Sequence, residues 1–157
     1  MNWNYYFYVD GCVLRWKIKN SRVSPGDAAG TLTKNGYIQV KVNQKRFYAH
    51  RIVWEMFGGK IPEWMQIDHI NHDRIDNSIE NLRVVTMSEN RKNSSKYSSN
   101  TSGTNGITWC SRDCKCRAQI RIDGKMKNLG RFSSFDEAVY ARKAADERYG
   151  FHKNHGA

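Results

Sequence analysis

Alternating apolar and polar positions predict strands in the first part of the chain. Residues 5–16 (YYFYVDGCVLRW) predict a hairpin that turns at Asp10-Gly11, a dipeptide favoured in two-residue turns. Residues 36–48 follow the period of a half-buried strand, with an inward set and an outward set: Ile38, Val40 and Val42 against Gln39, Lys41 and Asn43. Residues 50–57 predict a short helix that ends at Gly58-Gly59.

The next segment, residues 68–90, reads DHINHDRIDNSIENLRVVTMSEN. Its Asn81 opens the run NLRVV, which predicts a second strand, so a polar loop separates that strand from Asp68-His69 as in a hairpin. Ser88 is placed to cap a helix that carries Asn90.

These residue types suit phosphodiester hydrolysis, which needs a base for water, a hard cation at the phosphate and a group that orients the base. Asp68 and Asn90 offer only oxygen donors, which favours Mg²⁺ over zinc. An isolated Asp-His pair would be better explained as two exposed residues with no functional role. The presence of all four residues, Asp68, His69, Asn81 and Asn90, after the upstream His-Arg segment favours a nuclease site instead.

Together with AHRIVWEMFGG (residues 49–59), this segment resembles the HNH endonucleases of the homing type, which carry a ββα-metal active site. The resemblance implies that His69 is the general base and that Asn81 hydrogen-bonds it to fix its tautomer. It makes Asp68 and Asn90 ligands of one divalent ion, Mg²⁺ with Mn²⁺ as a substitute, and places His50 near the site. The other polar loop residues have simpler interpretations: turn formation for Asp73, Asp76 and Asn77, with hairpin support as a second role for Asn77, and a solvated position for His72.

Composition agrees with a nucleic-acid partner without identifying one. The chain has 26 Lys+Arg against 15 Asp+Glu, a net charge of +11, which favours polyanions. The excess lies at the two ends: +6 in residues 1–67, 0 in 68–102 and +5 in 103–157. The sequence shows no apolar run of membrane-spanning length and no signal-peptide pattern, so an intracellular location is expected, the host cytoplasm if the protein is phage-encoded.

Residues 93–102 (NSSKYSSNTS) have the composition of a flexible linker. Beyond it, residues 106–150 predict three short strands and a helix with a Ser134/Glu137 capping box, a turn at Asp123-Gly124 and an alanine stripe at Ala138, Ala141 and Ala145. The cluster CSRDCKC, with Cys110, Cys114 and Cys116, has too few ligands for a typical zinc site, so packing or exposed thiols are favoured over zinc.

This last segment resembles the Apetala-type, ethylene-response-factor DNA-binding domain in Gly106-Ile107, RAQIR (117–121), LGRF (129–132) and the alanine-rich helix. The resemblance implies that its sheet contacts DNA, and the candidates are Arg112, Arg117, Gln119, Arg121 and Arg131. One position departs from the pattern, because Cys116 stands where a tryptophan is common. A charged outer face with no DNA role is the alternative.

The sequence therefore predicts an α+β protein with a nuclease domain and N-terminal strands (1–92), a linker (93–102) and a DNA-binding domain (103–157). The expected activity is hydrolysis of double-stranded DNA to 5′-phosphate and 3′-hydroxyl ends, with no membrane and no small-molecule cofactor. A non-catalytic DNA-binding or regulatory protein on a nuclease scaffold is the alternative, and an RNA-directed nuclease is a weaker one. The target site, the number of strands cut and the oligomeric state are left open.

Overall fold

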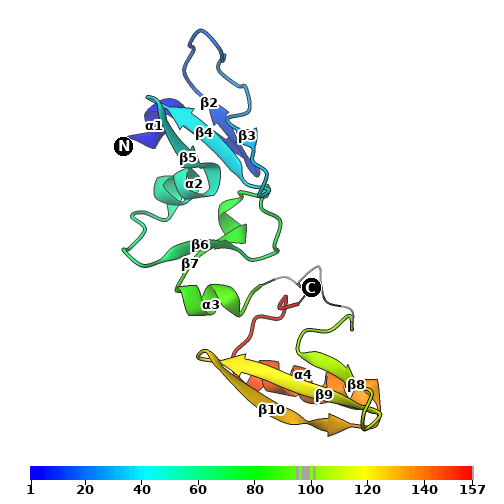
Figure 1. Cartoon of the computed structure of the whole chain (residues 1–157). Helices are drawn as coiled ribbons and strands as arrows, with labels where there is room; N and C mark the ends of the chain where they lie inside the picture. The colour runs from blue at the N-terminus through cyan, green and yellow to red at the C-terminus, as the bar shows by residue number, and fades with distance from the viewer. Residues whose placement is uncertain (95, 97–99, 101, 157) are drawn as a thin grey trace. The chain divides into compact units, whose positions relative to one another are not determined.

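The computed structural model describes residues 1–94, 96, 100 and 102–156. The chain divides into two compact units, Met1–Met87 and Ser88–Ala157, and each contains helices and strands (Figure 1). The predicted α+β class is therefore confirmed at this level. Half of the predicted linker, residues 95, 97–99 and 101, lies outside the described residues. No described helix is long and apolar enough to cross a membrane.

The first unit opens with two antiparallel arrangements of strands. β1 (Phe7–Asp10) and β2 (Val13–Trp16) form the predicted hairpin, and β3 (Thr31–Leu32), β4 (Ile38–Val42) and β5 (Lys45–Tyr48) form a three-stranded sheet. The β4–β5 turn has positive φ at both Asn43 (49°) and Gln44 (65°). Positive φ at both turn residues gives the turn a twist that matches the right-handed twist of the two strands that it connects.

Helix α2 (Ala49–Phe57) packs its inner face into the core of this unit. Ile52 and Val53 are at most 1% exposed, and they lie in one apolar cluster with Phe7, Leu14, Trp16, Val40, Val42 and Leu82. The helix ends where expected, with the Gly58 N–H donating to the carbonyl of Trp54 at 2.6 Å.

A short helix, α1 (Trp3–Tyr6), takes the place of the predicted first strand residues Tyr5 and Tyr6. Trp3 explains the difference, because its indole is 6% exposed, packs edge-on against Phe47 and donates Nε1–H to Glu55 Oε2 at 2.6 Å. Local sequence periodicity cannot predict a contact between residues more than 50 positions apart.

β6 (Gln66–His69) and β7 (Leu82–Val85) form the second predicted hairpin, with the 3₁₀ turn η1 (Ile79–Asn81) leading into β7. Helix α3 (Met87–Arg91) follows after one residue. It begins two residues earlier than a helix capped by Ser88 would, so Ser88 lies inside the helix and is not its cap. Ser88 is also the first residue of the second unit.

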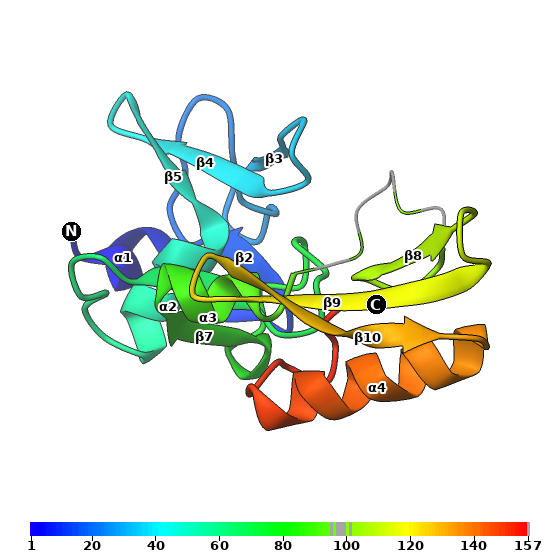
Figure 2. The ribbon, with the colours of Figure 1, turned by 60° about the horizontal axis from the view of Figure 1, so that its bottom comes forward.

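The second unit is a three-stranded antiparallel sheet covered by one long helix. The strands are β8 (Ile107–Cys110), β9 (Lys115–Ile122) and β10 (Lys125–Phe132), with β9 in the centre. Figure 2 shows α4 (Phe135–Arg148) running along one face of this sheet. The β9–β10 turn is the predicted Asp123-Gly124, with φ of 49° and 78°.

Local sequence signals fix how α4 begins and how it meets the sheet. Ser134 Oγ accepts from the Asp136 N–H at 3.1 Å, and Glu137 accepts from the Ser134 N–H, which together form the predicted capping box. Ala138 (0% exposed) packs on Ala118 and Cys116, and Ala145 is buried as well. Small side chains allow the helix to approach the sheet closely.

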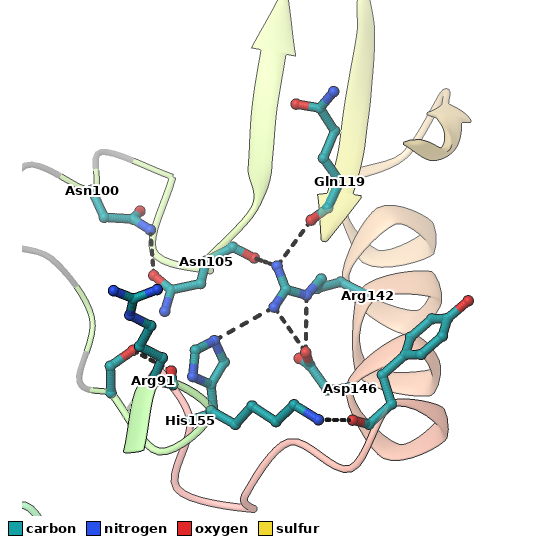
Figure 3. Close-up of polar contacts among 10 residues, drawn as sticks. Arg91, Asn100, Asn105, Gln119, Arg142, Asp146 and His155 are labelled. Atoms are coloured by element: carbon teal, nitrogen blue, oxygen red, sulfur yellow. Dashed lines mark hydrogen bonds and ion pairs between the residues drawn. The ribbon is translucent and has the colours of Figure 1, made fainter. Parts of the chain in front are cut away.

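The buried side chain of Arg142 connects α4 to β9 and to the segment before β8 (Figure 3). Its Nη1 donates to the carbonyls of Asn105 (3.0 Å) and Gln119 (2.9 Å), while Nε and Nη2 donate to Asp146 Oδ1. Gly106 leaves room for the guanidinium, because a Cβ there would lie 2.1 Å from Nη1. No local sequence pattern predicts this role for Arg142.

Candidate active site

The β6–β7 hairpin presents Asp68 and His69 on opposite faces. Its register pairs Asp68 with Arg83 and His69 with Leu82, and side chains alternate along a strand. His69 faces the interior and is 4% exposed. Asp68 faces the other way, so the two neighbours in sequence have different surroundings.

Aromatic rings and an amide surround the His69 imidazole. The ring centroids of His50 and Tyr37 lie 5.1 Å and 5.9 Å away, and Asn77 Oδ1 lies 3.2 Å from Nε2. Burial lowers the pKa of His69, although the Asn77 hydrogen bond and the Asp68 carboxylate act to raise it. The imidazole is therefore neutral at neutral pH, the form that accepts a proton from water.

His50 lies close to His69, as expected, but it is buried in α2. It is 7% exposed, stacks on Tyr48 and meets His69 edge-on, and within the described residues its Nδ1 has no hydrogen-bond partner. Burial first, and then the charges of His69 and Arg51, lower its pKa to about 3. This ring therefore stays uncharged and packs against the proposed base.

Asn81 holds the loop between the two strands. Its Oδ1 accepts from the backbone N–H of Asn71 at 3.0 Å, and its Nδ2 donates to the carbonyl of Asp76 at 2.8 Å. The family resemblance predicts a hydrogen bond between Asn81 and His69. In the structure that contact is made by Asn77, for which the sequence predicts a turn role, with hairpin support as a second role.

The loop forms the turns predicted at Asp73 and Asp76, and a further turn at Asn71. Asn71 Oδ1 accepts from the Asp73 N–H, Asp73 Oδ1 from the Ile75 N–H and Asp76 Oδ1 from the Ser78 N–H, at 2.8 to 3.2 Å. Each is a side chain that bonds to the backbone two residues on. These turns fold the loop beside His69.

Asp68 is the carboxylate proposed for a metal ion. Its side chain is 11% exposed, and its Oδ2 accepts two hydrogen bonds from Arg83, at 2.8 and 3.0 Å. Within the described residues no cluster of three or more His, Cys, Asp or Glu side chains forms. The proposed donors, a carboxylate and an amide, are oxygen ligands of the kind that hard divalent cations accept beside water and phosphate. The second donor, Asn90, lies in α3.

Four of the five predicted DNA contacts of the second unit lie on the sheet face that α4 leaves uncovered. Along β9, the side chains of Arg117, Gln119 and Arg121 alternate with three buried ones, Cys116, Ala118 and Ile120. Arg131 of β10 pairs with Arg117, and Arg131 also forms an ion pair with Asp113. Arg112 is exposed in the β8–β9 loop.

Cys116, which stands where the Apetala-type pattern has a tryptophan, belongs to the core of this unit. It is 4% exposed and packs with Ala118 and Ala138. The described cysteines are free thiols. In this chain the position serves packing under α4, while Trp109 on β8 is 57% exposed.

Comparison with known proteins places the nuclease motif in a family. Residues 47–92 match the HNH endonuclease family. The chain is 33% identical over 94 residues to Protein 3.8 of Escherichia phage T7, a match that covers 57% of this chain and 78% of that protein. No solved structure matches.

Two further relatives carry HNH in their names. Uncharacterized HNH endonuclease L560 of Acanthamoeba polyphaga mimivirus is 36% identical over 78 residues, 49% of this chain and 41% of that protein. YosQ of Bacillus subtilis (strain 168), an SPbeta prophage-derived protein whose name includes the words HNH homing endonuclease, is 34% identical over 55 residues, 35% of this chain and 32% of that protein. The chain thus spans less than half of each of these two. It belongs to the family of Protein 3.8 of phage T7 and carries an HNH endonuclease domain.

Proposed function

We propose that the protein is a metal-dependent DNA endonuclease of the homing type. The observation that carries this proposal is the buried His69 next to Asp68 on a ββ hairpin, inside the segment that matches the HNH family. A neutral imidazole with restricted motion is suited to general-base work near pH 7.

In the proposed reaction, His69 accepts a proton from a water molecule as the water oxygen attacks the scissile phosphorus. A new phosphorus–oxygen bond forms to the water oxygen, and the bond to the 3′ oxygen breaks in line. The electron pair of that bond leaves with the 3′ oxygen, which then takes a proton from solvent. The products are a 5′-phosphate and a 3′-hydroxyl.

HNH nucleases generally use a divalent metal ion, and Mg²⁺, with Mn²⁺ as a substitute, suits the oxygen donors proposed here. Asp68 would supply a carboxylate and Asn90 an amide oxygen, the latter proposed from the sequence resemblance. When bound, such an ion neutralises negative charge on the phosphate and the leaving oxygen. The Arg83 guanidinium meanwhile balances the Asp68 charge and fixes the orientation of its carboxylate.

Asp68→Ala is expected to raise the Mg²⁺ concentration needed for half-maximal plasmid cleavage by at least about tenfold, or to abolish cleavage. Arg83→Ala is the matched control, because it breaks the same ion pair but keeps the carboxylate. Its Mg²⁺ midpoint should stay near that of the natural chain. A normal midpoint in Asp68→Ala would remove Asp68 from the metal site.

We further propose that the second unit binds the DNA duplex through the sheet face opposite α4. Residues 88–157 hold 14 Lys+Arg against 7 Asp+Glu, so this unit favours a polyanion. Arginine at the outward positions of β9 is the side chain that most often reads guanine in the major groove. Arg112, Gln119 and Arg131 complete the proposed contact set.

The double variant Arg117→Ala/Arg121→Ala is expected to weaken DNA binding and to flatten its salt dependence. Each lost phosphate contact lowers the log–log slope by about 0.9, and each lost base contact reduces the preference for the target by about 1–3 kcal/mol. Arg148→Ala serves as the control, because Arg148 is an exposed arginine on α4, the helix on the other face of the sheet. Titrations at several salt concentrations measure both effects, and identical curves for the two variants would exclude this face as the DNA surface.

A further inference from the structure

Trp64 combines high exposure with a backbone conformation that tryptophan rarely adopts. The residue is 87% exposed, the highest value among the large apolar residues in the described part of the chain. Its φ of 71° lies in the left-handed region, where a bulky residue is a genuine outlier. The other described non-glycine residues with positive φ have smaller side chains: Asn43, Gln44, His72, Cys114 and Asp123.

The loop that carries Trp64 is folded against the first unit. It connects α2 to β6 (Figure 1), and Ile61 packs against the apolar core of that unit. A turn brings the Met65 N–H to the carbonyl of Pro62 at 3.2 Å. Two residues after Trp64, β6 begins and places Ile67 in the same core. The exposure of Trp64 is therefore a property of a folded turn that is anchored on both sides.

The exposed indole and the strained backbone both cost free energy in the free protein. Glycine would adopt this φ without the steric conflict of a side chain, and a polar residue would leave no apolar ring in water. Strained residues of this kind cluster at sites that bind ligands or substrates. An indole gains free energy when another flat, apolar surface covers it. Trp64 thus has the features of a contact residue for a partner with such surfaces.

DNA fits this position in charge and in reach. Residues 1–67, which include the loop, carry a net charge of +6 and attract a polyanion. Trp64 stands five residues before His69, so the two residues are at most about 18 Å apart along the chain. A duplex advances about 3.4 Å for each base pair. A duplex whose phosphate reaches His69 therefore extends as far as Trp64 within about five base pairs.

We propose that Trp64 is a DNA-contact residue whose indole stacks on a base of the bound duplex, at a kinked step within about five base pairs of the scissile phosphate. Apolar side chains that enter a base step unstack it and bend the duplex. Every base offers a flat face, so the contact adds affinity without reading the sequence. The choice of DNA as the partner rests on the proposed nuclease function.

The test uses substitutions that separate the indole from the backbone of the turn. Trp64→Gly and Trp64→Asn remove the ring, and both new residues tolerate a positive φ. Trp64→Phe keeps an aromatic face in the same turn. Tyr5→Ala is the matched control, because Tyr5 is an aromatic residue of the same unit that is 63% exposed on α1.

DNA affinity is measured with the full-length chain in EDTA on a short duplex, at several salt concentrations. Trp64→Gly and Trp64→Asn should weaken binding by about 5- to 100-fold, whereas Trp64→Phe and Tyr5→Ala should bind nearly as the natural chain does. The log–log slope of affinity against salt should not change, because a stacked base releases no counterions. The thermal midpoints of the Gly and Asn variants should equal or exceed the natural one, since both relieve the turn.

Tryptophan fluorescence provides a second readout that does not depend on affinity. The chain has five tryptophans, so the emission of Trp64 is the difference between the natural chain and Trp64→Phe. Saturating duplex should quench that difference if the indole stacks on a base. A difference that DNA leaves unchanged would overturn the proposal.

The remaining outcomes also decide between explanations. Natural affinity in both the Gly and the Asn variant, or a flatter salt slope in either, would overturn base stacking. Natural DNA affinity together with a smaller particle in size-exclusion chromatography of Trp64→Asn would assign the indole to a second copy of this chain. A natural chain that binds DNA through Trp64 but cuts no plasmid would refute the nuclease proposal alone. Plasmid cutting by a natural chain whose Trp64 variants bind normally would refute base stacking alone.

Discussion

His69→Ala is expected to lower the single-turnover cleavage rate by about 10²- to 10⁴-fold, the usual loss when a general base is removed. DNA affinity should change by less than about twofold, because the imidazole is neutral and 4% exposed and adds little to the positive surface. Quench experiments with saturating protein measure the rate, and gel-shift titrations measure the affinity.

His72→Asn is the control for this substitution. His72 lies in the same loop with φ of 67°, a conformation that asparagine tolerates, so the change should not strain the backbone. It should keep most of the cleavage rate. A His69→Ala protein that cleaves as fast as His72→Asn would show that another group activates the water.

The largest expected loss of stability is that of Arg142→Ala, about 3–5 kcal/mol. The substitution leaves the Asn105 and Gln119 carbonyls without this donor and removes the partner of Asp146, all around a side chain that is 5% exposed. Denaturant melts followed through a probe in the second unit should record a much lower midpoint for that unit.

Lys143→Ala provides the comparison, because Lys143 is the next residue of α4 and is exposed. Its effect should stay within about 0.5 kcal/mol. Equal midpoints for the two variants would mean that the Arg142 interactions contribute no net stability. Because the two units are compact separately, the first unit should keep its own melting transition in Arg142→Ala.

Local signals in the sequence predicted much of the secondary structure. The turn at Asp123-Gly124, the Ser134/Glu137 capping box and the Asx turns of the 71–78 loop each depend on residues within four positions. All the groups that form these turns and this cap lie within one short segment of the chain. Tertiary packing leaves these local interactions in place.

Tertiary contacts account for what the sequence could not predict. The α1 helix depends on Trp3 reaching Glu55, and the second unit depends on Arg142 joining Asn105, Gln119 and Asp146. An arginine in a charged helix has the pattern of a solvated residue until its partners are known.

In the candidate site, the types of residue could be predicted from the sequence. The hydrogen-bond partner of His69 could not. Asn77 and Asn81 are both asparagines near His69 in sequence, and only the folded loop shows which amide reaches the ring. The proximity of His50 and His69 was implied by the family resemblance, and it comes from the packing of α2 beside β6.

We expect this chain to hydrolyse DNA with a metal-assisted histidine base. The most direct measurement incubates the full-length protein with supercoiled plasmid in Mg²⁺ and in EDTA, beside His69→Ala purified in the same way, and then probes the new ends enzymatically. Only the natural chain in Mg²⁺ should cut the plasmid, and the new ends should be 5′-phosphate and 3′-hydroxyl. No cutting in Mg²⁺, equal cutting in EDTA or by His69→Ala, or 3′-phosphate ends would contradict it.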